Sequence, residues 1–248
     1  MITLTGTGEL ALAYQKQSHK DNVCVYSFRK MSDDEIGQIL SKTDVLIHNS
    51  AGLKNEDAQD NWQLTKRIVL LVLKNNPSLK FVNIGSMSYL NESGYKPIKE
   101  MSSYAYTKFL SEIYCIATLP VVKSIRFSSI FYCNPKRDGL SQLISNAVYE
   151  HKMTLLNGGS DKRDWIPLYL AVKYIDTVIN EQTDKCVNVA SGIPTSFLQA
   201  AKIIQKYSLS QINFKLIQTN QILSKFEKTI DVNLENEISH YIQYLKST

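Results

Sequence analysis

Short apolar runs alternate with amphipathic segments along the first half of the chain. The apolar runs are rich in β-branched and aromatic residues, as buried strands are, and lie at residues 2–5, 23–27, 44–48, 81–84 and 121–127. Segments with helical composition follow the first four of them, at residues 9–17, 31–42, 61–75 and 101–112. Because strands and helices alternate, the pattern predicts an α/β fold with a doubly wound parallel sheet.

The link between the second and third predicted strands is short. Ser32 followed three residues later by Glu35 is a capping box, which predicts a helix start at this position. The chain between residues 27 and 44 has no room for another complete strand and helix in addition to this one. We therefore expect the sheet to be reduced here.

The composition changes after Cys133, where the turn-rich sequence NPKRDG marks a boundary. Further helices are expected at residues 140–150, 169–179, 197–206 and 234–245, and further strands at 153–156 and 186–189. These pieces cannot all extend one sheet. We expect residues 1–133 to form the main domain, with later segments returning to it, and residues 134–248 to form mostly a small substrate-binding lobe.

Composition narrows the class of protein. The chain has 248 residues, 44% apolar and 21% charged, and its net charge of +5 is not clustered, which argues against a nucleic-acid partner. No metal site is expected, because the four cysteines show no CxxC or His-coupled spacing; they are interpreted as buried reduced thiols. No basic leader or apolar run of about 20 residues is present, so we expect a cytoplasmic protein without membrane contact.

The first predicted strand runs directly into a glycine turn, with the sequence TGTGELA. Strand, glycine turn and helix form the arrangement in which free backbone N–H groups and the helix dipole hold a pyrophosphate. Ala11 stands where a small residue lets helix and strand pack closely. The candidate cofactor contacts in this turn are Gly6, Thr7, Gly8, Glu9 and Leu10.

The ends of the next two predicted strands bear on the kind of cofactor. Arg29 and Lys30 follow the second strand, where an acidic residue would favour NAD(H); a guanidinium can instead grip a 2′-phosphate, so NADP(H) is favoured over NAD(H). The alternative is that both are solvated turn residues. The third strand is followed by small residues that leave room for a cofactor: Asn49, Ser50, Ala51 and Gly52.

The candidate chemistry centres on residues 101–112, MSSYAYTKFLSE. Tyr104 and Lys108 are four residues apart in a helical segment, so they project from one face, and an ammonium near a phenol favours the phenolate. The pair can thus serve as an acid/base catalyst, although such a spacing also occurs by chance on solvated helices. Ser86 and Ser88 supply hydroxyls at the carboxyl end of a central strand, where ligands bind in open parallel sheets.

In order along the chain, these motifs resemble those of the extended short-chain dehydrogenases/reductases, in the NAD(P)-dependent epimerase/dehydratase group that modifies nucleotide sugars. The similarity covers roughly residues 1–200. It rests on TGTGELA, DVLIHNSAG, Asn61, FVNIGSMS, YAYTK as a match to YxxxK, IRFSSIFY, KRDWI and CVNVASGIPTS. The resemblance implies a Rossmann-like fold and a nucleotide-sugar substrate, and a homodimer is common in the family.

Residue by residue, the resemblance implies that Ser86, Tyr104 and Lys108 are catalytic. Tyr104 would exchange a proton with a sugar oxygen, Lys108 would lower its pKa and bind the nicotinamide ribose, and Ser86 would hold the reacting oxygen. Arg163 in KRDWI would meet the substrate's diphosphate; the alternative is a surface ion-pair residue beside two aspartates. Ser88 is the alternative hydroxyl, and Ser129 is a further candidate contact to the substrate.

Three functions follow as hypotheses. The basic end of the second strand favours NADP(H)-dependent reduction of a nucleotide-linked keto sugar, with Tyr104 as proton donor. The same residues would serve an epimerase that keeps NAD tightly bound, and a non-catalytic cofactor-sensing protein on the same fold is the third possibility. Dehydration is disfavoured, because Met87 and Ser88 stand where the family's dehydratases have an acidic pair.

Overall fold

The computed structural model describes residues 1–18, 20–49, 58–181, 184–215 and 226–248. The chain divides into two compact units: residues 1–127 with 169–188, and residues 128–168 with 189–248. None of the helices formed by the described residues is long and apolar enough to cross a bilayer.

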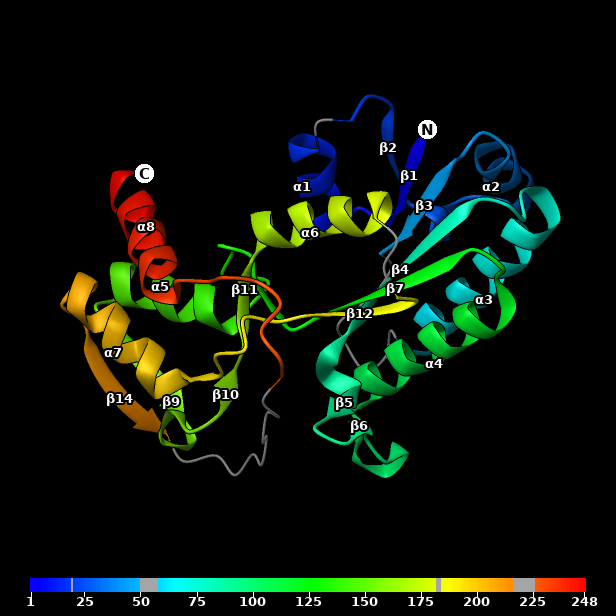
Figure 1. Cartoon of the computed structure of the whole chain (residues 1–248). Helices are drawn as coiled ribbons and strands as arrows, with labels where there is room; N and C mark the ends of the chain where they lie inside the picture. Colours follow the sequence, from blue (N-terminus) through cyan, green and yellow to red (C-terminus); the bar gives the residue numbers. More distant parts are fainter. Residues whose placement is uncertain (19, 50–57, 182–183, 216–225) are drawn as a thin grey trace. The chain divides into compact units, whose positions relative to one another are not determined.

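A six-stranded parallel sheet forms the centre of the first unit, with strand order β12-β7-β4-β3-β1-β2 (Figure 1). Its strands are β1 (Ile2–Thr5), β2 (Val23–Tyr26), β3 (Val45–His48), β4 (Lys80–Ser86), β7 (Val122–Phe127) and β12 (Cys186–Val189). The α/β class with a doubly wound parallel sheet is confirmed, and β3 lies directly beside β1. The reversal of strand order falls between β1 and β3.

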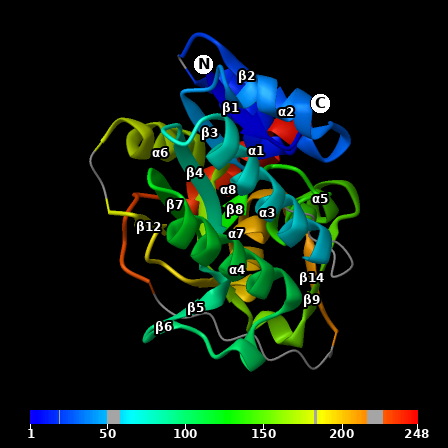
Figure 2. The same cartoon turned by 90° about the vertical axis from the view of Figure 1, so that its right-hand side faces the viewer.

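Helices cover both faces of this sheet. They are α1 (Glu9–Gln17), α2 (Asp33–Leu40), α3 (Ala58–Asn75), α4 (Ser103–Thr118) and α6 (Leu168–Asn180). In Figures 1 and 2, α2, α3 and α4 lie on one face, and α1 and α6 lie together on the other. The capping box of Ser32 and Glu35 is present at the start of α2, as predicted. The core under α2, α3 and α4 is built from apolar side chains such as Ile36, Ile68 and Phe81.

The returning segment of residues 169–188 is fastened to the first unit by polar contacts. The Tyr14 hydroxyl on α1 donates to Asp176 Oδ1 on α6 over 2.6 Å. Lys80 Nζ on β4 donates to Ile179 O over 2.7 Å, so a positive charge meets the carboxyl end of α6, where the helix dipole favours it. Helix α6 and strand β12 therefore belong to the sheet domain, although their sequence lies after the 133 boundary.

The first unit also contains several short elements between β4 and α4. They are the 3₁₀ helix η3 (Met87–Tyr89), the two-stranded hairpin β5 (Leu90–Asn91) and β6 (Gly94–Tyr95), and the 3₁₀ helix η4 (Ile98–Glu100). A further 3₁₀ helix, η1 (Phe28–Lys30), follows β2. The sequence predicts that the fourth strand ends at Ile84, whereas β4 continues through Gly85 and Ser86.

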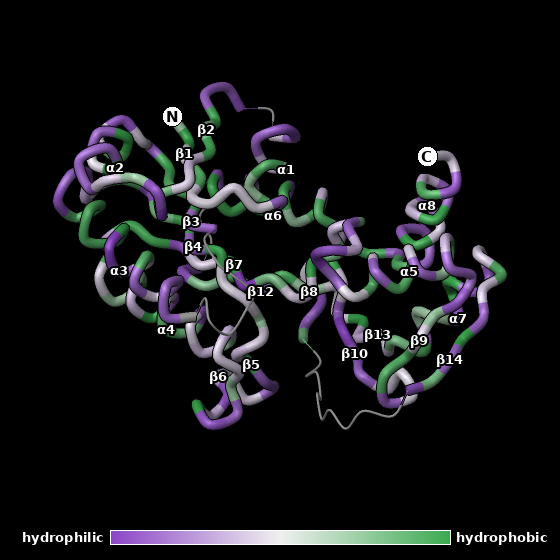
Figure 3. Tube along the Cα trace, turned by 180° about the vertical axis from the view of Figure 1, so that it is seen from behind, coloured by the Kyte–Doolittle hydropathy of each residue, from purple (hydrophilic) through white to green (hydrophobic). Residues whose placement is uncertain are grey.

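The second unit packs three helices against short strands. The helices are α5 (Gly139–Tyr149), α7 (Phe197–Ser208) and α8 (Leu234–Ser247); α8 alternates hydrophobic and hydrophilic residues, as an amphipathic helix does (Figure 3). The strands are β8 (Ser129–Phe131), β9 (Lys152–Leu156), β10 (Lys162–Arg163), β11 (Trp165–Pro167), β13 (Thr195–Ser196) and β14 (Gln211–Lys215). They form the two-stranded pairs β8 with β11, β9 with β14, and β10 with β13. That this unit binds substrate stays a prediction.

All four cysteines are free. Cys115 is buried and Cys24 and Cys186 are half-buried, whereas Cys133 is exposed. The expectation of four buried thiols is therefore wrong at Cys133, because the turn that follows β8 lies at the surface of its unit.

Candidate active site

Two hydroxyls meet at the end of the central strand β4. Ser86 is the last residue of β4, and its Oγ lies 3.0 Å from Ser88 Oγ and accepts a hydrogen bond from Ser88 N over 3.2 Å. Lys96 Nζ in turn donates to Ser88 O over 2.9 Å. Both candidate hydroxyls thus lie at one place, at the carboxyl edge of the parallel sheet where ligands bind in such folds.

Tyr104 lies in the first turn of α4. Ser102 caps this helix by accepting a hydrogen bond from Ala105 N over 3.2 Å, which fixes the helix start at Ser103, directly before the tyrosine. Burial raises the pKa of Tyr104, and a hydrogen bond with Ser86 opposes that rise. The structure therefore brings Tyr104 and Ser86 together, and it is Ser86 that works to lower the tyrosine pKa.

Lys108 lies one turn further along α4 and is buried, with 7% of its surface exposed. Its ammonium donates to Ile84 O over 2.7 Å. Burial lowers the pKa of Lys108 to about 8. In this structure the lysine is held by the backbone of β4, so the predicted lowering of the Tyr104 pKa by Lys108 stays a prediction for the loaded site.

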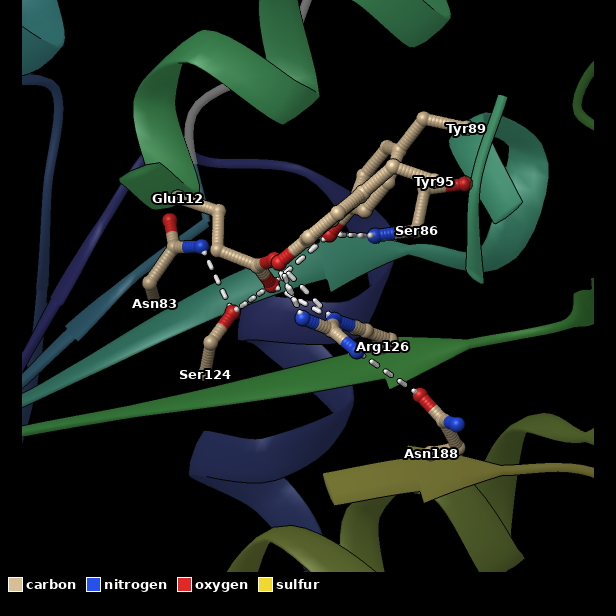
Figure 4. A network of polar contacts seen from close by, with 8 residues as sticks. All are labelled: Asn83, Ser86, Tyr89, Tyr95, Glu112, Ser124, Arg126 and Asn188. Carbon is tan, nitrogen blue, oxygen red and sulfur yellow. Dashed lines mark hydrogen bonds and ion pairs between the residues drawn. The ribbon is translucent and has the colours of Figure 1, made fainter. Parts of the chain in front are cut away.

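A buried ion pair lies one turn beyond Lys108, at Glu112 (Figure 4). Glu112 is fully buried and receives three hydrogen bonds from the Arg126 guanidinium, between 2.6 and 3.0 Å long. Burial alone would raise the pKa of Glu112, but the hydrogen bonds from Arg126 and Ser124 and the charge of Arg126 outweigh it and lower that pKa. Neither Glu112 nor Arg126 was among the residues predicted from the sequence.

The glycine turn joins β1 to α1 as the sequence predicted. Gly6 has φ +85°, a conformation that glycine adopts without strain, and Gly8 is the N-cap residue of α1, without a side chain to cap the helix. A Cβ placed on Gly8 would meet nothing within 4 Å. The fold itself therefore does not need glycine at position 8, and this open space at a helix N-terminus fits a pyrophosphate.

The remaining candidates of the turn lie at the start of α1. Thr7 lies between the two glycines and Glu9 is the first residue of the helix. The Leu10 side chain is buried in the core, so only its backbone N–H can serve a phosphate. Opposite them, the end of β3 is tied to β1: Thr5 Oγ1 lies 2.9 Å from His48 Nδ1 and accepts from Asn49 N over 3.1 Å.

His48 is buried at the end of β3, beside the point where the strand order of the sheet reverses. Its Nε2 lies 3.0 Å from Thr65 Oγ1 on α3, and burial lowers its pKa to about 3, helped by the charges of Lys108 and Arg29. Asn49 follows it, half-buried; Ser50, Ala51 and Gly52, also predicted to line the cofactor, lie outside the described residues. A neutral histidine thus fixes the strand end that precedes them.

Arg29 and Lys30 lie in η1, directly after β2, and both are exposed. The guanidinium of Arg29 donates to Asn61 Oδ1 on α3. Arg29 is therefore more than a solvated turn residue, and part of its hydrogen-bonding capacity is taken up by the protein. Asn61, named only as part of the sequence resemblance, is the residue that holds it.

The second unit contains the other substrate candidates. Arg163 lies in β10 and is partly buried, and burial lowers its pKa against the opposing charge of Asp161. Ser129 begins β8, and its N–H donates to Asp164 O over 2.9 Å. A cavity of about 300 Å³ lies in the same unit. It is lined by Trp165, Ser191, Ile193, Thr195, Val232, Asn233 and Leu234.

Asp164, one of the two aspartates that stand beside Arg163 in the sequence, connects several segments of the second unit. It is fully buried, and its carboxylate accepts hydrogen bonds from Ser191 N and Gly192 N, both over 2.8 Å, and from Ser128 Oγ over 3.3 Å. These contacts join β8, the KRDWI segment and the loop after β12. Asp164 is therefore occupied by backbone groups of its own unit.

The parallel sheet, with its glycine turn at β1 and its hydroxyls at the end of β4, is of the Rossmann-like kind that short-chain dehydrogenases/reductases share. Within that class, residues 31–190 match the NAD dependent epimerase/dehydratase family. Because the match covers more than half of the chain, the chain belongs to this family, and the resemblance seen in the sequence is confirmed. A comparison with curated proteins found no match.

Solved structures share the fold at low sequence identity. An NAD-dependent NDP-hexosamine 5,6-dehydratase of tunicamycin biosynthesis superposes with a TM-score of 0.81 and 17% identity, covering 100% of this chain and 98% of the other. UDP-glucose 4-epimerase of Thermotoga maritima, solved with UDP-glucose, gives 0.81 and 15%, covering 99% and 98%. A GDP-D-glycero-L-gluco-heptose synthase of Campylobacter jejuni, solved in the presence of NADPH, gives 0.76 and 13%, covering 100% and 98%.

Proposed function

We propose that the protein reduces a nucleotide-linked keto sugar with NADP(H), and that Tyr104 donates the proton to the sugar oxygen. The observation that carries this proposal is the meeting of Ser86 and Tyr104 at the carboxyl end of β4, with Lys108 one turn along the same helix. Ser86 holds the reacting oxygen, and Tyr104 holds the proton that this oxygen receives. The chemistry that a bound nicotinamide supplies is hydride transfer with the sugar carbon.

The residues that would hold the dinucleotide come from three strand ends. Backbone N–H groups from Gly6 to Leu10 would bind the pyrophosphate, and Arg29 with Lys30 would bind a 2′-phosphate. Lys108 would leave its bond to Ile84 O, or share it, to bind the ribose. Asn49, at the end of β3, would lie beside the ligand, and the substrate's diphosphate would meet Arg163.

A second candidate is an epimerase that keeps NAD tightly bound. The bond from Arg29 to Asn61 supports it, because a guanidinium already engaged by the protein is less available to a 2′-phosphate. The family is that of NAD dependent epimerases and dehydratases, and the similar Thermotoga maritima structure is a UDP-glucose 4-epimerase. The same Ser86, Tyr104 and Lys108 would serve this reaction. A cofactor-sensing protein without catalysis is the third candidate; it has no need of a buried tyrosine beside a hydroxyl.

Two measurements separate these candidates. The absorbance spectrum of the purified protein shows whether a nicotinamide is retained; retention supports the epimerase, whereas an empty site with NADPH oxidation supports the reductase. Turnover is then measured with NADPH and a panel of nucleotide-linked 4-keto sugars. Tyr104→Phe should abolish turnover and leave cofactor binding intact. Full activity of this variant would overturn the assigned role of Tyr104.

Cofactor preference has its own test at Arg29. Arg29→Ala should weaken NADPH binding by about tenfold, the loss expected for one charge-assisted contact, and leave NADH binding nearly unchanged. Lys74→Ala, at the far end of α3, is a matched control for loss of positive charge. Equal binding of NADPH and NADH by the unaltered protein would contradict the preference for NADP(H).

The expected homodimer is also a proposal. Helices α3 and α4 pack side by side and expose apolar residues, among them Leu70 with 55% and Ile113 with 39% of the surface accessible. A second copy would cover them. Light scattering should give the mass of two chains, and Leu70→Lys should shift it towards one; a monomer in the unaltered protein would reject the dimer. The cytoplasmic location stays a prediction.

A further inference from the structure

The carboxylate of Glu112 is the centre of a buried polar cluster beside the candidate active site (Figure 4). Two phenols contact it, one on each oxygen: Tyr95 donates to Oε1 over 3.0 Å and Tyr89 donates to Oε2 over 2.8 Å. Arg126 forms the ion pair and contacts the rings of both tyrosines, with its guanidinium carbon 6.0 Å from the Tyr89 ring centre and 5.2 Å from that of Tyr95. The cluster thus has two similar arms.

The two arms differ in what each phenol oxygen accepts. The Tyr95 oxygen accepts a hydrogen bond from Arg126 Nη2 over 2.7 Å, so both hydrogen bonds of this phenol go to the ion pair. The Tyr89 oxygen accepts a hydrogen bond from the backbone N–H of Ser86 over 3.4 Å, so Tyr89 connects the ion pair to the candidate active site. Because the single proton of Tyr89 is committed to Glu112, a lone pair of its oxygen is left for Ser86.

Glycine at position 85 allows this contact. Gly85 lies opposite Arg126 in the register of β4 and β7, and a Cβ on it would lie 2.7 Å from the Tyr89 hydroxyl. The same Cβ would lie 3.2 Å from Ser124 Oγ and 3.3 Å from Arg126 Cγ. Any larger residue would displace Tyr89 from Ser86. The absence of a side chain at position 85 of β4 therefore leaves the space that the Tyr89 hydroxyl occupies.

We propose that Tyr89 is a positioning residue. The Glu112–Arg126 pair holds Tyr89 in place, and Tyr89 fixes the backbone of Ser86. It thereby fixes the Ser86 hydroxyl that meets Tyr104. This inference rests on the proposed roles of Ser86 and Tyr104. Glu112 acts from the helix that carries Tyr104, and Arg126 acts from the strand beside β4. One ion pair thus sets helix α4 and the end of β4 relative to each other.

Tyr89 and Arg126 keep their protonation states over a wide pH range. Burial raises the pKa of Tyr89, and the neighbouring charge of Glu112 raises it further, so the phenol remains a proton donor. Burial works to lower the pKa of Arg126, but the hydrogen bonds and charge of Glu112 raise it above its ordinary value, so the guanidinium remains charged. The groups that face Tyr89 from β4, β7 and α4 are thus fixed donors and acceptors.

A pair of matched variants tests the proposal. Tyr89→Phe and Tyr95→Phe each remove one phenol that donates to Glu112, but only Tyr89→Phe removes the acceptor of the Ser86 N–H. A second variant, Gly85→Ala, displaces the Tyr89 hydroxyl without deleting it. All three are compared with the unaltered full-length protein after their melting temperatures have been measured, so that lost activity is separated from lost folding.

Two readouts need no substrate. Hydrogen exchange of the Ser86 amide should be faster by about tenfold in Tyr89→Phe and in Gly85→Ala, and unchanged in Tyr95→Phe, since one hydrogen bond contributes about that factor. NMR of tyrosine labelled at Cζ, with the Tyr104 signal assigned from Tyr104→Phe, should show a higher titration midpoint for Tyr104 in the first two variants only. Identical behaviour of Tyr89→Phe and Tyr95→Phe in both readouts would overturn the proposal.

Turnover adds the functional readout. With NADPH and whichever nucleotide-linked keto sugar is turned over, Tyr89→Phe should lower kcat by about tenfold to a hundredfold with little change in KM, because a misplaced group costs the transition state more than substrate binding. Tyr95→Phe should keep kcat within about twofold. If no sugar is turned over, the proposed function fails, while amide exchange and the Tyr104 titration still decide whether Tyr89 positions Ser86.

Discussion

The ammonium group of Lys108 donates a hydrogen bond to the carbonyl oxygen of Ile84 over 2.7 Å. This contact joins helix α4 to the central strand β4 two residues before Ser86. It satisfies a lysine that is buried without a carboxylate among its described hydrogen-bond partners. The charge of Lys108 is therefore costly to the fold, and its pKa is lowered by burial to about 8.

Lys108→Met should change how stability depends on pH. Below about pH 8 the folded protein bears the full cost of the buried charge, and between about pH 8 and 10.4, the ordinary lysine pKa, only the unfolded chain holds the proton. Stability contributed by this group therefore rises with pH, by about 3 kcal/mol across that window. In urea unfolding at several pH values, the free energy of unfolding of the unaltered protein should rise relative to that of Lys108→Met as the pH increases. A difference that does not change with pH would reject the lowered pKa.

Gly6→Ala should lower stability, whereas Gly8→Ala should impair dinucleotide binding. Alanine at position 6 would have to adopt φ +85°, so this variant should lose about 1 kcal/mol of stability. Alanine at position 8 meets nothing within 4 Å, so its stability should be unchanged or slightly higher, while its Cβ occupies the space assigned to the pyrophosphate. Thermal melts and NADPH fluorescence titrations measure the two effects; dinucleotide binding that survives Gly8→Ala would argue against the pyrophosphate site.

Asp164→Asn should destabilise the second unit. The carboxylate accepts two backbone N–H groups, one on each oxygen, and an asparagine side chain would turn its NH2 towards one of them. Losing a buried charge-assisted bond and leaving an N–H unpaired should cost about 2–3 kcal/mol. Urea denaturation measures this loss. Asp161→Asn, a few residues earlier, serves as the control, and equal stability of the two variants would contradict the role given to Asp164.

Leu209→Gly should stabilise the protein. Leu209 ends helix α7 in the left-handed conformation, with φ +58°, and 88% of its surface is exposed, so its side chain contributes little packing. Glycine adopts this conformation without strain, and the gain should be about 1 kcal/mol. Leu209→Ala removes the same side chain but keeps the strain and should show no such gain. A lower melting temperature for Leu209→Gly than for Leu209→Ala would refute the prediction.

Much of the fold was predictable because its strands and helices carry clear periods. The six strands of the main sheet and the capped start of α2 follow from local sequence. The strands β8, β10, β11 and β13 were missed because two or three residues are too few to show a period. Likewise the sequence predicts that this strand ends at Ile84, because glycine weakens a strand, but β4 extends through Gly85 and Ser86.

The candidate site was predictable where chemistry is local and hidden where it is not. Tyr104 and Lys108 share a helix face, which spacing reveals, and Ser86 follows an apolar run. Glu112 and Arg126 are 14 residues apart on different elements, and single charges usually indicate solvent exposure. A signal was present, since Arg126 interrupts an apolar strand and Glu112 precedes Ile-Tyr-Cys on a buried helix, but the sequence does not show that the two meet.

The position of β12 has a consequence for how the protein is made. Strand β7 is complete at Phe127, but its outer neighbour β12 ends at Val189, about 60 residues later. At a synthesis rate of about 5–20 residues per second, the nascent chain waits about 3–12 s with the edge of β7 unpaired. A fragment ending at residue 133 would keep that open edge permanently and would lack Asp176 to meet Tyr14. Residues 128–168 of the second unit must therefore be synthesised before the sheet of the first unit can be completed.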